Sequence, residues 1–587
     1  MEVTRLFDLP YYQLEKFPQE DALCDKVNGQ WVKTSTKEYI DKANAISRGL
    51  LKKGIQPGDK VALISNNRSE WNICDIGIQQ IGAISVPVYP TISPDDYRYI
   101  FNDAGVRLCI VSDEELYQKV NSIIDQVETL NEIFTFNKVA NAPSWEALLL
   151  DADEELDAEI EKRKAAIKYE DLVTLIYTSG TTGNPKGVML SHKNLLSNVK
   201  ACEPRLPVDS SAKSLSFLPV CHVYERMLLY LYQYTGVSVY FAESMDTIGD
   251  NLKEVKPQVF TAVPRLLEKV YDKIIAKGEA LSGIKRKLFF WAVELGEQYD
   301  VKNRSAFYDF KLKIARKLIF SKWQEALGGN TLAVASGSAA LQPRLARVYL
   351  AAGIPVMEGY GLTETSPVIS VNCEKGNRVR IGTTGTVLDN VEVKIAEDGE
   401  ILVKGPNVMM GYYNMPEKTA EVIDKDGWFH TGDIGELEEG AYLKITDRKK
   451  EIFKTSGGKY IAPQVMENKF KESRFIEQIM VIGENQKMPA ALIVPAYEFI
   501  REWAKHKGYE IGDSTAAIAA NETVRARIEK EINKFNQGFG KWEQIKRFEL
   551  VGHAWTPETG ELTPTLKPKR RVLLEKHKDL YDKIYNS

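Results

Sequence analysis

Long apolar runs, paired cysteines and clustered histidines are all missing from this 587-residue chain. No uncharged apolar stretch approaches the roughly 20 residues of a membrane-spanning helix, so we expect none. The N-terminus, MEVTRLFDLPYYQLEKFP, has no basic start followed by an apolar run, so we expect no signal peptide either.

The six cysteines are scattered without a CxxC pair, and the six histidines form no HxxxH or HExxH. This pattern predicts reduced thiols in a cytoplasmic enzyme and gives no support to a zinc site. The cysteines are Cys24, Cys74, Cys109, Cys202, Cys221 and Cys373.

An excess of charge of one sign is also lacking, since 77 Lys and Arg face 81 Asp and Glu. Nothing in this balance favours nucleic acid as a partner. Residues 269–322 are an exception, with 13 Lys and Arg against 6 Asp and Glu around the apolar patch Leu288–Leu295. The segment is either a helical layer whose lysines extend to solvent or a face that touches a membrane surface.

Strand and helix patterns alternate in the first third of the chain. Lys60–Asn67, Ala83–Pro90 and Val106–Asp113 read as buried strands separated by amphipathic segments, which predicts a parallel α/β fold. The charge-rich pattern of residues 151–168 predicts an exposed, solvated helix, with Glu159 and Arg163 one turn apart.

After Gly385 the pattern changes to short strands and tight turns. Val391–Gly405 predicts two strands joined through Asp398 and Gly399. A mixed α/β segment follows Lys444–Ile452.

A loop rich in glycine and hydroxyl groups, YTSGTTGNPKGVMLSH, runs from Tyr177 to His192. Strand-like Leu172–Tyr177 precedes it and Gly187–Leu190 follows, so we predict strand–loop–strand rather than the strand–loop–helix of a Walker motif. Gly180 and Gly183 let backbone N–H groups turn inward.

The side chains of this loop complete a site for a polyphosphate. Lys186 supplies a positive charge, and hydroxyl donors come from Thr178, Ser179, Thr181 and Thr182. A flexible hairpin is the alternative, but it does not account for the lysine and the hydroxyl run together.

Five stretches in this order resemble the adenylate-forming enzymes, a family that includes acyl-CoA synthetases, luciferases and peptide-synthetase adenylation domains. The resemblance covers nearly the whole chain. It implies an α/β fold, with residues 1–447 forming a large adenylation domain of α/β sheets plus a small β-barrel-like part. Residues 448–587 would form a small, mobile α+β lid domain. The five stretches are Tyr177–His192, Met357–Pro367, Gly427–Gly435, Asp447–Pro463 and Glu561–Arg571.

The reaction that the resemblance implies joins a carboxylic acid to ATP, giving acyl-AMP and pyrophosphate, and then transfers the acyl group to coenzyme A. A carboxylate with a pKa near 4 needs no general base, so charge neutralisation and positioning are the requirements. The implied cofactors are ATP, Mg²⁺ and coenzyme A.

The resemblance places several residues around the nucleotide. Lys186 would lie near the departing pyrophosphate, Glu364 would hold Mg²⁺, Thr363 would reach the α-phosphate and Tyr360 would stack on adenine. A surface carboxylate is the alternative for Glu364. The remaining residues implied at the adenine side are Gly337, Ser338, Glu358 and Gly359.

Asp433 would accept both ribose hydroxyls, with Arg448 as a second ribose contact; a turn residue is the alternative for Asp433. Lys567 would contact the charge that develops during adenylation, although a solvated basic tail over 567–571 is the alternative. Lys450 matches the hinge of the lid domain. The pantetheine tunnel would be lined by Gly457 and Gly458.

The acid is indicated by Phe217–Ser244 and the helical insertion after it, which resemble the long-chain fatty acyl-CoA synthetases. His222 would lie near the acyl-adenylate, or else be an ordinary core histidine. Apolar side chains across 217–262 would line an alkyl tunnel, where each buried CH₂ contributes roughly 0.8 kcal/mol. Arg226 stands where some long-chain members have a gating tryptophan, so that gate is not expected here.

The main hypothesis is therefore a long-chain fatty acid–CoA ligase that takes fatty acid, ATP and CoA. A fatty acyl-AMP ligase passing the acyl group to a carrier protein is the first alternative. A non-catalytic nucleotide-binding or lipid-surface protein is the second, and five intact charged residues argue against it: Lys186, Glu364, Asp433, Lys450 and Lys567. Peripheral contact with the inner membrane surface accompanies the hypothesis, and the sequence predicts no oligomeric state.

Overall fold

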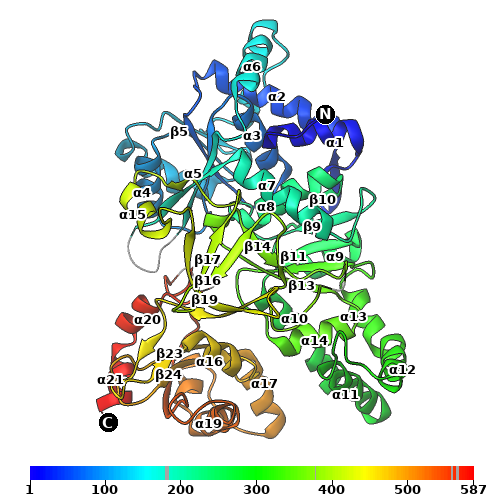
Figure 1. Ribbon diagram of the computed structural model, residues 1–587, viewed down its shortest axis with the longest axis vertical. Coiled ribbons are helices and arrows are strands. Elements are labelled where there is room, and N and C mark those ends of the chain that lie inside the picture. The colour runs from blue at the N-terminus through cyan, green and yellow to red at the C-terminus, as the bar shows by residue number, and fades with distance from the viewer. Residues whose placement is uncertain (179–183, 377, 557–558, 564–566, 587) are drawn as a thin grey trace. The chain divides into compact units, whose positions relative to one another are not determined.

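A computed structural model describes residues 1–178, 184–376, 378–556, 559–563 and 567–586 (Figure 1). The chain forms two compact units. The first comprises Met1–Lys394, Leu402–His430 and Glu438–Leu443, and the second Ile395–Ile401, Thr431–Leu437 and Lys444–Ser587. The chain passes between the units within β16 (Glu392–Ile395), β17 (Glu400–Lys404), β19 (Phe429–Glu438) and β20 (Tyr442–Arg448).

A seven-stranded sheet in the first unit has the order β18-β8-β7-β4-β3-β5-β6. Its neighbours from β7 to β6 are parallel, whereas β8 runs antiparallel to β7. Its central strands are continuous apolar runs because both faces of a parallel sheet are covered. The bounds are β3 (Lys60–Ile64), β4 (Ile84–Pro87), β5 (Val106–Val111), β6 (Glu132–Thr135), β7 (Leu172–Thr178), β8 (Lys186–Ser191) and β18 (Gly411–Tyr412).

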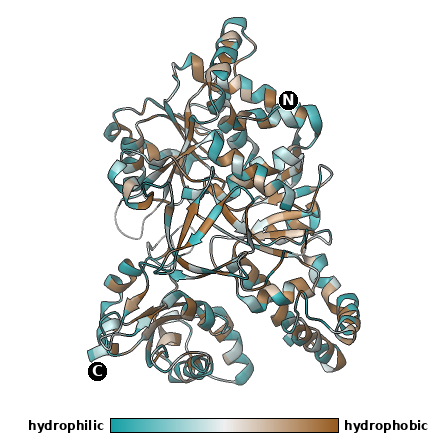
Figure 2. Ribbon diagram, in the orientation of Figure 1, coloured by the Kyte–Doolittle hydropathy of each residue, from teal (hydrophilic) through white to brown (hydrophobic). Residues whose placement is uncertain are grey.

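A second sheet of the first unit contains the order β15-β14-β13-β12-β11-β9-β10-β1-β2. Its strands from β13 to β1 are parallel, so their carboxyl ends share one edge. Figure 2 shows apolar residues along these central strands. The bounds are β1 (Leu23–Val27), β2 (Gln30–Thr34), β9 (Lys213–Ser216), β10 (Ser238–Phe241), β11 (Val259–Ala262), β12 (Ala333–Ser336), β13 (Val356–Gly361), β14 (Val368–Val371) and β15 (Thr386–Val387).

Helices pack on both sheets of the first unit. Tyr97 and Phe101 on α4 join the core of the seven-stranded sheet, and the helices after β11 share a second core around Phe289, Phe320 and Trp323. The helices are α1 (Leu9–Lys16), α2 (Thr36–Lys52), α3 (Ser69–Gln80), α4 (Pro94–Ala104), α5 (Glu114–Asn121), α6 (Glu154–Ala166), α7 (His192–Cys202), α8 (Val223–Thr235), α9 (Ile248–Val255), α10 (Pro264–Glu279), α11 (Gly283–Glu297), α12 (Ala306–Ala315), α13 (Ser321–Ala326), α14 (Pro343–Ala351) and α15 (Pro416–Val422).

The second unit is built on a three-stranded sheet in the order β23-β24-β25. Helices cover this sheet around Met466, Phe470, Ile500 and Ile528, giving the unit its own apolar core. The elements are β21 (Phe453–Lys454), β22 (Tyr460–Ile461), β23 (Ile476–Ile482), β24 (Ala490–Pro495), β25 (Arg547–Leu550), α16 (Pro463–Phe470), α17 (Tyr497–Lys507), α18 (Thr515–Ala520), α19 (Glu522–Asn536), α20 (Arg570–Lys576) and α21 (Lys578–Asn586).

Most predicted elements are confirmed, including the three early strands and the turn at Gly399, which has a positive φ of 85°. The predicted α/β class is confirmed, but the sheets formed by the described residues are open, so the barrel-like part is not a closed barrel. All six cysteines are buried and unpaired. Within the described part of the chain, every helix is too short or too polar to cross a membrane.

The solvated helix predicted over 151–168 is only partly so. Glu159 and Arg163 form the expected ion pair at 2.9 Å. However, Asp157 pairs with Arg48 of α2 at 2.6 Å, and Arg163 also donates to the carbonyl of Ile55. The charges of α6 therefore attach it to the unit rather than face only solvent.

Candidate functional site

The predicted phosphate loop connects β7 to β8, so the strand–loop–strand prediction is confirmed. Thr178, the last residue of β7, is paired with Lys186, the first residue of β8. These two residues define the start and the end of the loop. The predicted ligands Ser179, Gly180, Thr181, Thr182 and Gly183 lie outside the described residues.

Lys186 and Glu364 are brought together by a residue that the sequence analysis missed. The ammonium of Lys186 lies 4.0 Å from the centre of the Tyr412 ring, and the hydroxyl of Tyr412 donates to Glu364 Oε1 at 2.8 Å. Strand β18 places Tyr412 here by pairing with β8, with Tyr412 opposite Val188. A cation and a carboxylate on one aromatic ring suit a phosphate and a hard metal ion.

Glu364 projects from a tight turn after β13. At Gly361 an added Cβ would lie 1.8 Å from the carbonyl oxygen of Pro367, so only glycine fits. Thr365 closes the turn through hydrogen bonds to Leu362 and Pro367. The buried Thr363 lies next to Glu364 in the same turn. The motif thus presents both residues on a rigid support.

The predicted adenine-side residues lie at the carboxyl ends of β12 and β13, where α/β sheets commonly bind ligands. Gly337 and Ser338 follow β12, and the other three, Glu358, Gly359 and Tyr360, lie in the last part of β13. The Glu358 carboxylate accepts the backbone N–H of Leu341 at 3.0 Å, and burial raises the pKa of Glu358 to about 7. Glu358 therefore holds the loop that contains Gly337 and Ser338.

His222 lies at the same edge, as the N-cap of α8. Its Nδ1 accepts the backbone N–H of Tyr224 at 3.1 Å. An added Cβ at Gly337 would lie 3.2 Å from the Tyr224 ring, so this glycine permits close packing against α8. Tyr224, two residues after His222, thus packs against Gly337 of the predicted adenine wall.

Arg226 is buried in the core. Its guanidinium pairs with Asp75 at 2.6 Å and donates to Thr174 Oγ1 at 2.7 Å, while its side chain is 1% exposed. Asp75 also accepts a hydrogen bond from Tyr230 at 2.5 Å. Arg226 is therefore part of a buried ionic network linking α8, α3 and β7, and that network explains why the gate position holds an arginine.

Glu225 is a buried carboxyl group that the sequence analysis overlooked. Its carboxylate accepts the hydroxyl of Ser216 at 2.6 Å and that of Thr261. Burial raises the pKa of Glu225 to about 7. Because Ser216 ends β9 and Thr261 lies in β11, Glu225 connects the ends of two neighbouring strands next to His222.

The second unit groups three of the predicted residues. Arg448 Nε lies 3.5 Å from Asp433 Oδ1, and both charges act on Lys567. Burial, followed by the nearby Arg448, lowers the pKa of Lys567 to about 8, while Asp433 and Glu451 oppose the shift. The predicted ribose contacts, Asp433 and Arg448, and the candidate catalytic lysine therefore form one cluster.

The loop carrying Lys567 is closed by local hydrogen bonds. Thr563 donates its N–H to the carbonyl of Lys567 at 2.8 Å, and the Lys567 N–H donates to Thr563 Oγ1 at 3.0 Å. Below this closure Leu562 and Pro568 form a β-bridge. These contacts give Lys567 a defined place opposite Thr563 in a short hairpin.

Arg570, three residues further on, is not part of a solvated tail. Its side chain pairs with Glu451 at 3.1 Å and with Glu467, and it donates to the carbonyl of Val481 at 3.0 Å. Arg571, by contrast, is 75% exposed. Arg570 therefore attaches the Lys567 hairpin to the segment that follows the predicted hinge, and the solvated-tail alternative is wrong for this residue.

The predicted hinge, Lys450, is exposed at the end of β20. On its N-terminal side Lys449 pairs with Asp398 at 2.6 Å and with Glu400 at 2.8 Å. Asp447 accepts the backbone N–H groups of Arg448 and Gln464, and burial raises its pKa to about 7. Lys450 is thus a solvent-facing position that follows two tethered residues, Asp447 and Lys449.

Gly457 and Gly458 lie in the exposed turn between β21 and β22, and Gly458 has a φ of 74°. An added Cβ at Gly458 would meet no atom within 4 Å. The turn is therefore open, although the positive φ still favours glycine at this position.

Two histidines and a glutamate meet at the base of the Lys567 hairpin. Ligand atoms of His553, Glu561 and His577 lie within 4.8 Å of one another. However, the Trp555 N–H donates to His577 Nε2 at 3.2 Å, and the Lys576 ammonium lies 3.9 Å from Glu561. This hydrogen bond and this ion pair involve atoms that would bind a metal, so we interpret the cluster as part of the hairpin's support.

Two family descriptions match the chain. The AMP-binding enzyme family matches residues 11–413, and the AMP-binding enzyme C-terminal domain matches residues 450–587. The chain belongs to the family of AMP-binding enzymes. The resemblance read from the five sequence stretches is thereby confirmed.

Individual relatives match along almost the whole chain. Long-chain-fatty-acid–CoA ligase FadD15 of Mycobacterium bovis is 34% identical over 567 residues, which cover 95% of this chain and 93% of that protein. Long-chain-fatty-acid–CoA ligase 5 of Rattus norvegicus is 33% identical, covering 95% and 84%. The fold is similar to that of the adenylation domain of a carboxylate reductase from Mycobacterium chelonae, with a TM-score of 0.76, 22% identity and coverage of 99% and 91%.

Proposed function

We propose that this AMP-binding enzyme is an AMP-forming long-chain fatty acid–CoA ligase. It activates a long-chain fatty acid with Mg-ATP to give acyl-AMP and pyrophosphate, and then transfers the acyl group to the thiol of CoA, releasing AMP. The names of the relatives at 33–34% identity, both long-chain-fatty-acid–CoA ligases, support this substrate class. All six thiols are unpaired, which suits a reducing, cytoplasmic location.

The observation that carries the proposal is the grouping of Lys567 with Arg448 and Asp433 in the second unit. In our proposal Asp433 and Arg448 bind the ribose, and Lys567 donates to the charge that develops during adenylation. A partly desolvated ammonium is worth more to such a transition state than one in water.

In the first unit we propose that the triphosphate of ATP binds to Lys186 and to the glycine-rich loop that precedes it. Glu364 would hold Mg²⁺, which fits a carboxylate that Tyr412 already orients by a hydrogen bond. Thr363 would contact the α-phosphate. The adenine would lie at the ends of β12 and β13, with His222 toward the acyl group.

The domain roles are part of the same proposal. Residues 1–447 would bind ATP and the fatty acid, and residues 448–587 would act as a lid that carries Lys567 and turns at Lys450. Gly457 and Gly458 would line the path of pantetheine, where the missing side chains permit close passage.

A fatty acyl-AMP ligase is the second candidate, and CoA dependence separates the two. The named relatives are CoA ligases, so this alternative is not favoured. The test measures release of AMP and pyrophosphate from Mg-ATP with acids from acetate to oleate, with and without CoA. We expect CoA-dependent AMP release that peaks on long chains, with acyl-CoA identified by mass spectrometry. Accumulation of acyl-AMP regardless of CoA would overturn the proposal.

A further inference from the structure

Helix α12 presents apolar side chains to solvent on one face. Phe307 and Phe310 are 67% and 60% exposed, and Ile314 and Leu318 continue the stripe as exposed residues. The spacing of three and four residues places these side chains on one side of α12 and of the π-helical segment Arg316–Phe320 that extends it.

The opposite side of the same helix is already packed. Leu312 and Ala315 are buried in the core, and Tyr308 donates its hydroxyl to the carbonyl of Leu295 at 2.7 Å. A surface helix of a water-soluble protein ordinarily places polar residues on its outer face. The apolar stripe of α12 is therefore not needed for packing within the first unit, and an exposed stripe of this kind marks an interaction surface.

The first turns of α11 repeat the pattern. Ile284 is 77% exposed, and Leu281 and Leu288 are exposed as well. The two helices are consecutive in the chain and pack on one another. They lie together at the lower right of Figure 1.

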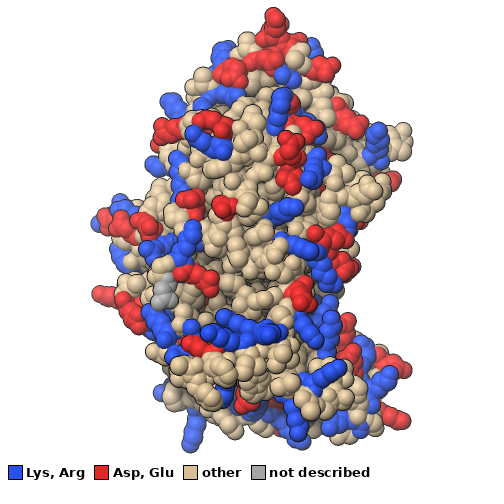
Figure 3. Space-filling model, turned by 90° about the vertical axis from the view of Figure 1, so that its right-hand side faces the viewer, with Lys and Arg blue, Asp and Glu red and all other residues tan. Residues whose placement is uncertain are grey.

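Basic residues alternate with these apolar ones. The run Lys285-Arg286-Lys287 follows Ile284, and lysines at 311, 313 and 317 lie among the apolar positions of α12. Two acidic residues of the same region form ion pairs, Asp309 with Arg304 at 2.8 Å and Glu297 with Arg344 at 3.4 Å, whereas Glu294 of α11 is exposed. Figure 3 shows this side of the molecule, with tan side chains among Lys, Arg and some Asp and Glu toward its lower end.

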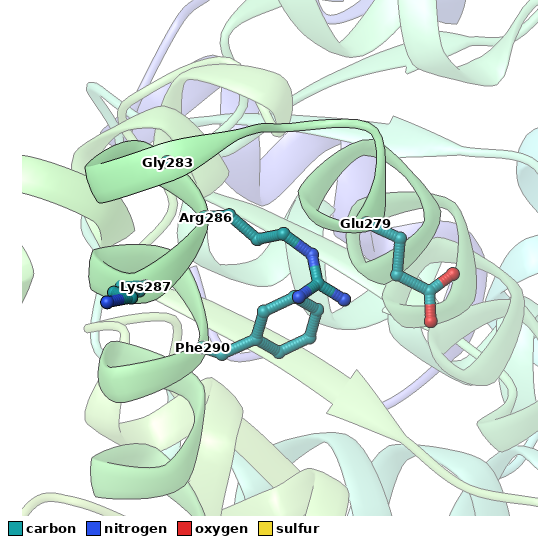
Figure 4. Close-up of a pocket in the computed structure, with 5 residues that line it drawn as sticks. All are labelled: Glu279, Gly283, Arg286, Lys287 and Phe290. Carbon is teal, nitrogen blue, oxygen red and sulfur yellow. The ribbon is translucent and has the colours of Figure 1, made fainter.

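A pocket of about 510 Å³ opens beside the first turns of α11 (Figure 4). The Arg286 guanidinium lies over the Phe290 ring, 5.1 Å from its centre, and Glu279 of α10 faces it across the pocket. Gly278 of α10 allows α10 and α11 to approach closely, because a Cβ at this position would lie 2.1 Å from Phe289 of α11. The pocket lining is completed by Gly283 and Lys287.

From these observations we infer that the outer face of α11 and α12 binds the surface of a bilayer containing anionic phospholipid. The apolar stripe enters the boundary of the acyl chains, and the lysines contact the lipid phosphates. Charge complementarity selects this partner, since the interleaved side chains are basic and apolar, the combination that binds an anionic interface. The inference does not rest on the proposed catalytic function.

The test is flotation of the whole protein with phosphatidylcholine vesicles, with and without phosphatidylglycerol, in the absence of ATP and fatty acid. We expect binding only to the mixed vesicles and weakening by salt. The double variant Phe307→Ser, Phe310→Ser should bind about 100-fold more weakly, because two exposed rings no longer enter the interface. Lys313→Gln with Lys317→Gln should lose the preference for phosphatidylglycerol.

Trp542→Ser is the matched control, because Trp542 is 53% exposed and belongs to the second unit. It should bind vesicles as the unchanged protein does. No flotation of the unchanged protein, or equal flotation of the phenylalanine variant, would overturn the inference. So would a dimer in light scattering that the phenylalanine variant converts to monomers, since the face would then contact a second copy of the chain.

Discussion

Replacing Lys567 by methionine should slow adenylation strongly and, at the same time, stabilise the second unit. The pKa of this lysine is lowered from 10.5 to about 8, first by burial and then by Arg448. This difference corresponds to about 3 kcal/mol against the ammonium in the fold at neutral pH. Methionine has a similar length and no charge. The free energy of unfolding of the Lys567→Met variant should therefore exceed that of the unchanged protein by up to about 3 kcal/mol at pH 7.

The sign of the pH dependence follows from the same shift. Between pH 8 and 10.5 the folded protein binds fewer protons at Lys567 than the unfolded chain, so unfolding takes up protons. The stability of the unchanged protein should therefore rise with pH across this window, and the advantage of the methionine variant should disappear above it. Denaturant unfolding of both proteins at several pH values measures the difference.

Activity gives an independent reading of the same group. In the free enzyme Lys567 loses its proton above pH about 8, so kcat/KM for acyl-AMP formation should fall about tenfold for each further pH unit. Lys567→Arg should remove this fall, because a guanidinium stays charged. Lys567→Ala should adenylate about 10²–10³-fold more slowly at pH 7. An adenylation rate that is level to pH 10, or a methionine variant less stable than the unchanged protein, would refute the reasoning.

Three further substitutions test other parts of the proposal. Lys450→Pro locks φ at the hinge, so acyl-AMP formation should persist while thioester formation stops; equal loss of both half-reactions would contradict the hinge. Arg570→Met should slow adenylation about tenfold or more, because the buried Glu467 loses its ion pair and the Lys567 segment loses its link to Glu451. Arg571→Met, at a 75% exposed side chain, should not. Glu364→Gln should raise the Mg²⁺ concentration for half-maximal adenylation about tenfold. An unchanged Mg²⁺ titration would show that Glu364 does not bind the metal.

The site could be predicted where the chemistry lies in short stretches of sequence. Two apolar runs around a glycine-rich loop predict a strand–loop–strand, and the structure shows β7 and β8 paired up to Thr178 and Lys186, as expected. Gly361 and Gly399 are glycines for steric reasons within their own turns, so a local sequence motif is enough to identify them. The roles of Lys186, Asp433 and Lys567 toward the nucleotide remain predictions, because they depend on ligands and on the substitutions above.

The residues that sequence reasoning missed act through contacts between distant segments. Tyr412 reaches Glu364 only because β18 pairs with β8, more than 200 residues away in the chain. Arg570 stands in a run of basic residues, and no sequence pattern separates it from Arg571. The difference is that Glu451, after β20, and Glu467 on α16 reach Arg570 and not Arg571. Arg226 similarly finds Asp75 on another helix.

The sequence by itself determined the α/β class, the strand–loop–strand arrangement around the glycine-rich loop and the family, because periodicity and motifs are local properties of the chain. Only the tertiary structure decided which charges are buried and which apolar side chains are exposed. Phe307 and Phe320 belong to the same helical stretch, yet one is 67% exposed and the other is fully buried. Which side of that stretch meets the core depends on helices and strands contributed by other parts of the chain.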